Sequence, residues 1–400
     1  MELKTGYKQT EVGVIPSDWS VTQVKELGEV KRGAGSQYTT YTGESNGIRF
    51  IRINDFFENN PVFVDPTSHM MRFAIHQDDI LFAGTGNTAG ASFIPLNEWV
   101  GLPHSYNAPR IRVNNKINKQ FLLYCLQSEY LLRQQKGLFV GAAQPFLDTK
   151  AIAHFDIALP STLAEQTAIA TALSDTDQYI SHLEKLIAKK RNIKQGAMQE
   201  LLKPKEGWVV KRLGEIGIVI RGASPRPQGD TRFYGGTVPR LMVEDVTRDG
   251  KFVTPKVDFL TEEGAKRSRP CKAGTLTIVC SGTVGIPSIL AVDACIHDGF
   301  LALVKIKREY SSDYLYHQLI VLREKFEQSA THGGVFTNLT TSILKEFEIT
   351  FPSENEQTRI ATILSDMDAE ITILETKLSK AQSIKQGMMQ QLLTGKIRLV

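Results

Sequence analysis

Cysteine is scarce in this chain, and its cysteines lack the spacing of a metal site or a disulfide framework. The four residues are Cys125, Cys271, Cys280 and Cys295. Zinc sites and small disulfide-bonded domains both use closely spaced cysteine pairs. The sequence therefore predicts neither feature, and unpaired thiols fit a reducing compartment.

Long hydrophobic runs and targeting segments are also missing. No apolar run approaches the length of a membrane span, and the first residues do not read as a signal peptide. With 42% hydrophobic and 22% charged residues, the composition is that of a globular protein, which we expect in the cytoplasm. A net charge of +4 is too small to indicate nucleic-acid binding by itself.

Familiar catalytic motifs are absent or incomplete. Neither a GxxxxGK[ST] phosphate loop nor an HExxH zinc motif occurs. Residues 82–86 spell FxGxG, by which amino-methyltransferases hold S-adenosylmethionine, but no Asn/Asp-Pro-Pro-aromatic string follows and residues 87–92 do not open a helix. We predict a tight connection between strands there. Residues 148–150 have the DxK spacing of nucleases and are predicted to form a surface turn.

The most informative feature present is internal repetition. Residues 165–202 recur at 356–393, a constant offset of 191, and 22 of the 38 aligned positions are identical. Such self-similarity has to be recognised before any fold is assigned. Because the repeated unit is long, it indicates a duplicated pair of domains rather than a short solenoid repeat.

Apolar residues in both copies recur at alternating steps of three and four, the pattern of a coiled-coil seam. Thr176, Lys190 and Lys194 interrupt the seam of the first copy, and Lys385 interrupts the second. These polar residues would cost stability unless the partner helix accommodates them. The residues that we expect to pair the helices or dock a partner are Leu173, Ile180, Leu183, Ile187, Leu201, Leu364, Ile371, Leu374, Leu378 and Leu392.

Each helix is predicted to begin at a capping box, Thr162 with Glu165 and Ser353 with Glu356. At about 1.5 Å per residue such a helix is roughly 55 Å long, which favours a spacer over an ordinary amphipathic helix of an all-helical domain. Gly196 and Gly387 recur inside the helices, where glycine costs about 1 kcal/mol. Either another backbone approaches closely there, or the glycines are a relic of the duplication.

The diverged remainder of each repeat keeps its order of motifs. A tryptophan, an LGE string, an arginine followed by glycine, and a glycine-rich stretch recur in both halves. Short β-rich segments and turn signals predict an α+β fold. We predict globular domains at 1–160 and 205–351, each followed by a long helix, at 161–204 and 352–400.

Basic and polar residues cluster locally in both predicted domains. Arginines beside turn residues can present a fork to phosphates or to a guanine edge, although a solvated surface explains many of them equally well. The predicted DNA-binding residues are Lys31, Arg32, Gln37, Tyr38, Arg52, Asn87, Tyr106, Arg221, Ser224, Arg226, Arg232, Tyr234, Arg240 and Arg269.

The doubled EQxxIAxxLSDxD and IKQGxMQxLL strings, together with the segments 7–19 and 393–398, resemble the specificity subunits of type I restriction-modification enzymes along the whole chain. The resemblance implies that the domains at 1–160 and 205–351 are target recognition domains that each read half of a split DNA sequence, and that the chain termini come together. It also implies that the long helices form an antiparallel coiled coil with an internal pseudo-twofold axis. It also implies helices that dock two methylation subunits and, through them, restriction subunits. S-adenosylmethionine, ATP and magnesium are then expected on those partners, and no catalytic or metal residue is expected in this chain.

Physical reasoning leads to a related expectation. Two different readers at opposite ends of an antiparallel helix pair would meet a double helix in reversed orientation, so the target is expected to be bipartite and asymmetric. Helix length would set the gap between half-sites. Two alternatives stay open: a self-contained DNA adenine methyltransferase built on the 82–86 loop, and a coiled-coil scaffold without a role on DNA.

Overall fold

The computed structural model describes residues 5–58, 60–139, 145–329, 331–333 and 336–399. The chain forms two compact units that do not follow sequence order. Unit 1 comprises Met1–Glu184 and Thr376–Val400, and unit 2 comprises Lys185–Glu375. Each unit therefore contains parts of both long helices. Within the described residues, no helix is both long and apolar enough to cross a membrane.

Both long helices are present, as the repeat predicts. Helix α5 spans Leu163–Leu201 and helix α12 spans Glu354–Leu392. They begin at the predicted caps, because the hydroxyls of Thr162 and Ser353 accept hydrogen bonds from the backbone N–H three residues later. The boundaries of the four expected segments stay a prediction, since the compact units divide inside the helices.

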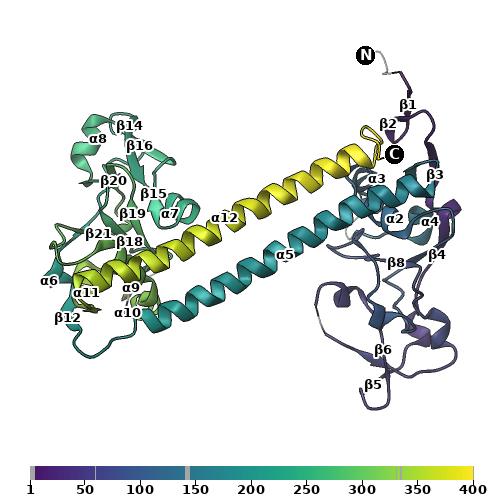
Figure 1. The fold of residues 1–400 in the computed structure, drawn as a ribbon, viewed down its shortest axis with the longest axis horizontal. Helices are drawn as coiled ribbons and strands as arrows, with labels where there is room; N and C mark the ends of the chain where they lie inside the picture. Colours follow the sequence, from purple (N-terminus) through teal and green to yellow (C-terminus); the bar gives the residue numbers. More distant parts are fainter. Residues whose placement is uncertain (1–4, 59, 140–144, 330, 334–335, 400) are drawn as a thin grey trace. The chain divides into compact units, whose positions relative to one another are not determined.

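Unit 1 joins its part of the two helices to a small α+β body (Figure 1). Its central sheet has the order β4-β10-β8-β9, and β5-β7-β6 form a second sheet on the side away from α5. The strands are β1 Tyr7–Thr10, β2 Gly13–Pro16, β3 Ser20–Gln23, β4 Gly28–Lys31, β5 Tyr41–Thr42, β6 Ile48–Arg49, β7 Phe63–Val64, β8 Asp79–Phe82, β9 Ser92–Phe93, β10 Arg110–Val113 and β11 Asp156–Leu159. The α-helices before α5 are α1 Val24–Leu27, α2 Lys119–Leu126, α3 Glu129–Phe139 and α4 Thr149–Ala153, and the 3-10 helices are η1 Ser36–Tyr38, η2 Ile53–Phe56, η3 Met70–Phe73 and η4 Asn97–Trp99.

Unit 2 repeats this plan with different side chains. Its central sheet has the order β13-β21-β18-β19-β15, and a second sheet has the order β16-β14-β20-β17. The strands are β12 Val209–Arg212, β13 Ile218–Arg221, β14 Tyr234–Leu241, β15 Phe252–Val253, β16 Asp258–Leu260, β17 Pro270–Cys271, β18 Leu276–Val279, β19 Pro287–Leu290, β20 Ala294–Ile296, β21 Phe300–Val304, β22 Thr331–Gly333, β23 Phe336–Asn338 and β24 Glu348–Phe351. The shorter helices are α6 Leu213–Ile216, α7 Val243–Asp249, α8 Glu262–Arg267, α9 Ser312–Val321, α10 Arg323–Ser329 and α11 Thr341–Glu346.

A glutamine in the first turn of each long helix ties that helix to its unit. Gln166 and Gln357 are both buried, and each donates to the carbonyl of the proline that precedes its helix. Their side-chain oxygens accept from the backbone N–H of Asn118 and Ser311, which cap α2 and α9. The glutamine of the Glu-Gln pair that opens both repeats therefore has the same structural role twice.

The two ends of the chain meet in unit 1, as the resemblance implies. Tyr7 donates its hydroxyl to the carbonyl of Gly395, near the C-terminal end drawn in Figure 1. Arg398 pairs with Asp18 at 2.9 Å and donates to Glu165 at 2.8 Å. The carboxylates of Glu165 and Glu356 thus accept from Arg398 and Arg359, rather than forming the second half of the predicted capping boxes.

The expected seam is buried or half-buried along both helices, and its polar interruptions are paired. In unit 2, Lys194 on α5 pairs with Asp368 on α12. In unit 1, Lys385 on α12 pairs with Asp177 on α5 at 2.6 Å. Since 177 and 368, like 194 and 385, are separated by 191 residues, these are the same ion pair formed twice with the helices exchanged.

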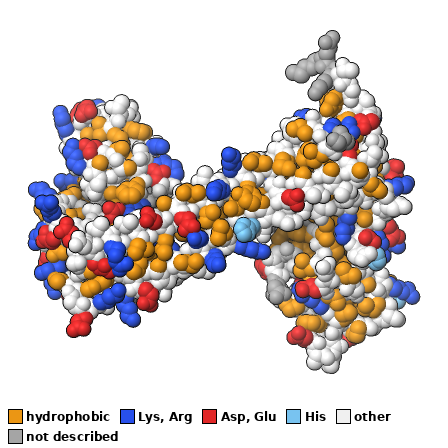
Figure 2. Space-filling view, in the orientation of Figure 1, with side chains coloured by type: hydrophobic (Ala, Val, Ile, Leu, Met, Phe, Trp, Pro, Cys, Tyr) orange, Lys and Arg blue, Asp and Glu red, His pale blue; other side chains and the backbone are white. Residues whose placement is uncertain are grey.

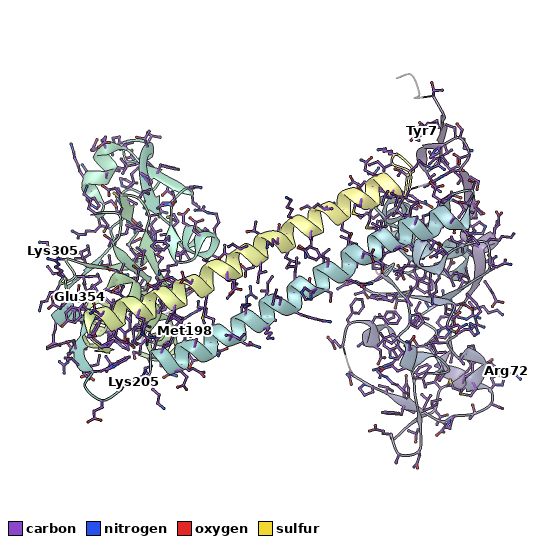
Figure 3. All side chains as sticks on the ribbon, viewed as in Figure 1. Tyr7, Arg72, Met198, Lys205, Lys305 and Glu354 are labelled. Atoms are coloured by element: carbon purple, nitrogen blue, oxygen red, sulfur yellow. The ribbon has the colours of Figure 1, made fainter. Side chains whose placement is uncertain are left out.

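The remaining interruptions also find partners on the facing helix. Lys190 pairs with Glu370 at 2.6 Å in unit 2, and the hydroxyl of Thr176 lies 3.6 Å from the sulfur of Met388 in unit 1. Met198, near the end of α5, and Glu354, at the start of α12, lie at the same end of unit 2 (Figure 3). Within that unit the two helix segments therefore run in opposite directions.

The recurring glycines are not explained by close packing inside the chain. A Cβ atom placed at Gly196 or Gly387 would meet nothing within 4 Å among the described residues. The expectation that another backbone of this chain approaches there is wrong.

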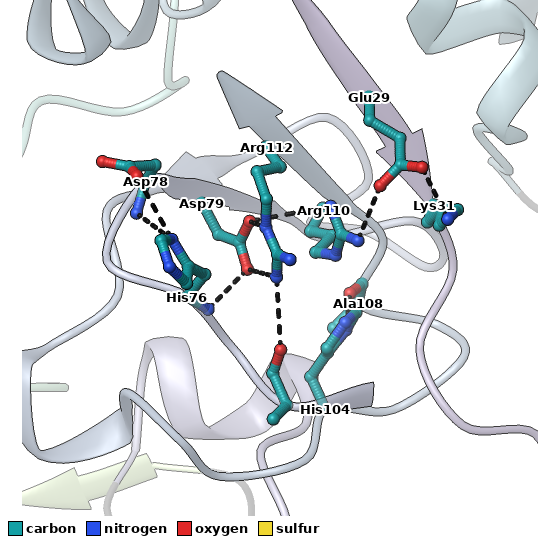
Figure 4. A network of polar contacts seen from close by, with 10 residues as sticks. Glu29, Lys31, His76, Asp78, Asp79, His104, Ala108, Arg110 and Arg112 are labelled. Atoms are coloured by element: carbon teal, nitrogen blue, oxygen red, sulfur yellow. Dashed lines mark hydrogen bonds and ion pairs between the residues drawn. The ribbon is translucent and has the colours of Figure 1, made fainter. Parts of the chain in front are cut away.

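A charged network crosses the central sheet of unit 1 (Figure 4). Asp79 on β8 is fully buried and accepts two hydrogen bonds from Arg112 on β10, at 2.8 and 3.0 Å. Arg110 lies 3.6 Å from the same carboxylate and donates to Glu29 on β4 at 3.0 Å. The next pair along the strands, Ile80 with Ile111, matches Leu276 with Leu303 of unit 2, so Asp79 and Arg112 correspond to the uncharged Thr275 and Val304. The two sheets therefore share their strand order but not their chemistry.

His104 lies behind this network and is completely buried. Its Nδ1 is 2.7 Å from the carbonyl oxygen of Ala108, which fits a neutral ring that donates from Nδ1. Burial lowers the pKa of His104 to about 4, and the nearby Arg110 acts in the same direction. The native state therefore holds this side chain uncharged at neutral pH.

We predict that the swapped ion pair stabilises the helix contact. Asp368→Lys places two cations together in a half-buried site, and we expect it to lower the free energy of unfolding by about 1 kcal/mol. Adding Lys194→Asp restores the pair with reversed charges and should recover most of the loss in denaturant titrations. Lys194→Asp should not rescue Asp366→Lys, at an exposed position on the same helix. Equal rescue of both variants would contradict the pairing.

We predict a pH-dependent loss of stability from His104. In the unfolded chain His104 binds a proton below about pH 6.5, whereas in the folded protein it stays unprotonated down to about pH 4. Stability should therefore fall as the pH drops through this range, by about 3 kcal/mol from this residue. His104→Asn should flatten the stability curve between these pH values, and His182→Asn, at an exposed position on α5, should leave it unchanged. Identical curves for both variants would refute the assignment.

Candidate nucleic-acid interface

Each unit brings four chain segments together beside its central sheet, and we call this place the junction. In unit 1 it comprises residues 32–34, 50–54, 84–88 and 103–107. The backbone N–H groups of Ala34, Ile51 and Gly84 donate to carbonyls of the 103–107 segment at 2.7 to 2.9 Å. In unit 2 the corresponding N–H groups of Ala223 and Cys280 donate to Ile296 and Gly299. The same backbone frame therefore carries different side chains in the two units.

A glycine makes this frame possible in both units. A Cβ atom at Gly33 would lie 2.1 Å from the carbonyl oxygen of His104, and one at Gly222 would lie 2.0 Å from that of His297. No side chain fits at these distances, so the arginine-glycine string shared by both repeats follows from a close backbone approach. The arginine before the glycine is thereby fixed at the end of its strand.

Arg32 lies in a stack of aromatic rings in the unit 1 junction. Its guanidinium carbon is 4.3 Å from the ring centre of Tyr106 and 4.8 Å from that of Phe146. Its Nη1 also donates to the carbonyl oxygen of Tyr106 at 3.4 Å. Both rings are nearly half exposed. A cation between two rings has little freedom to rotate, so Arg32 is held in one orientation at the surface.

Arg221 occupies the equivalent place in unit 2 and is likewise held by a backbone carbonyl, but without aromatic rings from the described residues. Its Nε donates to the carbonyl oxygen of Asp298 at 3.0 Å. The carboxylate of Asp298 accepts from the hydroxyl of Ser224 at 2.7 Å and lies 3.6 Å from Arg226. Three predicted residues are therefore gathered around an acid that was not predicted.

Asp298 remains ionised in this setting. Partial burial would raise its pKa, but the hydrogen bond from Ser224 and the adjacent His297 and Arg226 outweigh burial and hold the pKa of Asp298 below its ordinary value. Burial lowers the pKa of His297, so its ring is neutral at pH 7. The unit 2 junction thus presents a carboxylate among arginines, whereas the unit 1 junction presents aromatic rings.

The other predicted residues of unit 1 are spread around the junction. Arg52 borders a pocket of about 420 Å³, and Asn87 lies between two residues that line it. The lining residues are Tyr41, Phe50, Arg52, Ile53, Asn54, Thr85, Gly86, Thr88, Ser105 and Asn107. Arg52 donates to the carbonyl of Asn60 at 3.0 Å. Asn87 and Gln37 are exposed, and Tyr38 stacks on His69 with ring centres 4.6 Å apart. Lys31 is engaged with Glu29.

Several predicted residues of unit 2 are already engaged with other protein groups. Arg232 binds both carboxylate oxygens of Asp230, and Tyr234 donates to the carbonyl of Pro225 at 2.7 Å. Arg240 is only 3% exposed and binds Asp258 and Ser224. Its burial differs from the expected exposed basic face and leaves it able to orient Ser224 rather than to reach DNA.

The junction includes residues that the sequence did not point to. Phe146 lies against Arg32, and Asp298 accepts a hydrogen bond from Ser224. His297 lies beside them and pairs with Asp298. Nothing in the sequence pointed to Phe146 as a junction residue, because it is far in sequence from Arg32. Asp298 could have been suspected, since it is an acid in the stretch that corresponds to the 103–107 segment. The predicted list as a whole stays a prediction.

The two partial motifs have structural roles. The 82–86 segment ends β8 and turns towards β9, with Gly86 at a positive φ of 80°, as predicted for a tight connection. Asp148 caps α4 by accepting from the backbone N–H of Ala151 at 2.6 Å, so the DxK string begins a helix and the predicted surface turn at 148–150 is wrong. In the described part of the chain, no group of three or more His, Cys, Asp or Glu side chains is arranged to hold a metal ion.

Charge is mixed, rather than gathered in one area, on the face drawn in Figure 2. On the face drawn in Figure 2, the Lys and Arg side chains of unit 2 alternate with Asp and Glu. The same is true in detail, because Arg212, Arg248 and Lys272 are each paired with an acid. The arginines at the junctions therefore indicate a DNA-binding face better than the net charge does.

Comparison with known proteins identifies the family. The model for the type I restriction modification DNA specificity domain matches residues 16–195 and again 205–383. A putative type I restriction enzyme MjaX specificity subunit from Methanocaldococcus jannaschii is 26% identical over 98% of this chain and 97% of its own length. The MjaVIII specificity subunit of the same organism is 29% identical over 44% of this chain and 43% of its own length.

Solved structures show the same fold. The crystal structure of the type I restriction-modification S subunit from M. genitalium superposes with a TM-score of 0.62 at 15% identity, over 98% of both chains. A chain from a structure concerned with complex assembly and conformational transition of the type I R-M system gives 0.58 at 17% identity, over 96% of this chain and 99% of that one. Because the two matched domains cover most of the sequence, this chain belongs to the family of DNA specificity subunits of type I restriction-modification systems.

Proposed function

We propose that this chain reads a bipartite, asymmetric DNA sequence, with one half-site read at the junction of each unit. The observation that carries the proposal is the repeated junction: one backbone frame holds Arg32 in one unit and Arg221 in the other, surrounded by different side chains. A shared frame with divergent side chains suits two readers that dock in the same way on different bases. The chain itself acts in recognition and carries no catalytic step.

The long helices act as the spacer between the two readers. We propose that α5 and α12 form an antiparallel coiled coil with a pseudo-twofold axis. The exchanged ion pairs, Lys194 with Asp368 and Lys385 with Asp177, support this arrangement. With 39 residues each, the helices are about 58 Å long at 1.5 Å per residue. A rigid pair of this length would fix the gap between half-sites.

The duplicated helix surfaces suit two copies of one partner. Two equivalent faces generated by an internal twofold would bind two methylation subunits in the same way. Restriction subunits would join through them. S-adenosylmethionine would then be bound by the methylation subunits, and ATP and magnesium by the restriction subunits. A complex that methylates and cleaves DNA would work in the cytoplasm.

Binding to DNA should combine an electrostatic part with a sequence-specific part. Exposed arginines at the junctions would neutralise phosphates, so affinity should fall with salt for every duplex. Preference for one site should persist at each salt concentration. A scaffold without a role on DNA would show no such preference. A self-contained methyltransferase would bind S-adenosylmethionine without partners, which calorimetry on the isolated chain detects.

We predict that the two half-sites can be exchanged independently. Mapping methylated adenines in cells that express this chain with its methylation subunit should reveal one split target. Replacing residues 1–160 with the matching domain of a relative should change one half of that target and leave the other half and the gap unchanged. Exchange of 205–351 is the reciprocal control. A change in both halves from a single exchange would contradict independent readers.

A further inference from the structure

Arg32 and Arg221 stand out from the other basic residues because they occupy the same place in the two repeats. Arg32 follows the last residue of β4, and Arg221 is the last residue of β13, and both are followed by the glycine that allows close backbone contact. β4 pairs with β10 as β13 pairs with β21. Divergence has changed most side chains around them, but not the arginine.

Each of these arginines keeps one complete hydrogen-bonding edge unengaged. Arg32 uses Nη1 for the carbonyl of Tyr106, which leaves the Nε and Nη2 edge without a partner among the described residues. Arg221 uses Nε for the carbonyl of Asp298, which leaves the Nη1 and Nη2 edge. Two parallel N–H groups on one edge are what a bidentate contact requires.

Most other candidate arginines lack this property. Arg232 is bound to Asp230, Arg52 to the carbonyl of Asn60, and Arg240 is buried with Asp258. Arg226 and Arg269 are exceptions in unit 2: Arg226 lies 3.6 Å from Asp298, and Arg269 uses only its Nε, for the carbonyl of Arg221. The side chain of Arg269 contacts Arg221 rather than the 296–299 segment, so Arg269 serves as the matched control.

The major-groove edge of guanine presents two acceptors, O6 and N7, at the spacing of an arginine fork. Lysine can also donate to O6 and N7, but its ammonium lacks the planar fork that fixes the direction of the contact. The rings of Tyr106 and Phe146 fix the plane of Arg32, and the carbonyl of Asp298 fixes Arg221. Both guanidinium groups are therefore oriented before DNA arrives, which reduces the entropy lost on binding.

We propose that Arg32 and Arg221 each read one guanine, one in each half-site, through a bidentate contact to O6 and N7. Tyr106 and Phe146 act as positioning residues for Arg32. This inference rests on the proposed function, since it assigns bases to readers that must first bind DNA. It adds that both halves of the target contain a guanine at the position facing the arginine.

The test uses the full chain and a duplex that carries the mapped target. Each guanine is replaced in turn by 7-deazaguanine, which keeps base pairing and O6 but removes the N7 acceptor. We expect one guanine in each half-site to show a loss of affinity of about tenfold in fluorescence anisotropy. Arg32→Ala should abolish the sensitivity in one half-site only, and Arg221→Ala should abolish it in the other.

Matched variants separate base reading from charge and from folding. Arg32→Lys and Arg221→Lys retain the charge without the planar fork and should reduce the 7-deazaguanine sensitivity, less completely than the alanine variants. Arg269→Ala and Arg72→Ala should weaken binding to all duplexes at most uniformly and leave the sensitivity in place; Arg72 is an exposed residue of η3 at the periphery of unit 1 (Figure 3). Unchanged thermal unfolding of each variant confirms that the junction is folded.

Three results would overturn the inference. The first is 7-deazaguanine sensitivity that persists in Arg32→Ala or Arg221→Ala, and the second is sensitivity that disappears in Arg269→Ala instead. The third is a target with normal site preference in which no guanine responds. In all three the chain still prefers its target, so the proposed function survives. Equal affinity for the target and a scrambled duplex would instead refute the proposed function, and the inference with it.

Discussion

The structure depends on contact between two helices that come from different halves of the chain. Neither unit contains a complete long helix, and the core of unit 1 includes Leu392 and Leu393 from the end of α12. The buried seam supplies most of the stabilisation expected at such a contact, because burial of apolar side chains is its main favourable contribution. The register of the two helices is fixed by the ion pair between Lys385 and Asp177 and by its repeat between Lys194 and Asp368.

Register is the property that hydrophobic contact alone does not fix. Two helices with an apolar seam can shift by one heptad with little loss of buried apolar area. A lysine in the seam, however, finds its acidic partner in only one register. Both the aspartate and the lysine lie inside strings shared by the two repeats. A single pair of residues therefore specifies the alignment twice, once in each unit, without further sequence.

The recognition units show how much side-chain chemistry can change on one frame. The pair Asp79 with Arg112 in unit 1 corresponds to Thr275 and Val304 in unit 2. A buried ion pair with satisfied hydrogen bonds and two uncharged side chains can both fill such a position, because each avoids an unpaired buried charge. The backbone contacts at Gly33 and Gly222 allow no comparable change, since any side chain would overlap a carbonyl oxygen. Divergence is therefore confined to positions where alternatives exist.

The sequence by itself determined the duplication, the two long helices, their caps and the seam, because these follow from local patterns and from the offset between repeats. It also located Arg32, Arg221 and Ser224 near turns that the structure places in the junctions. Only the tertiary structure decided which of the predicted DNA-binding residues have side chains free to contact DNA. Arg240 is buried and Arg232 is bound to Asp230, while Phe146 and Asp298 enter the junctions from distant parts of the chain. Such proximity depends on how segments far apart in sequence pack, and no local pattern records it.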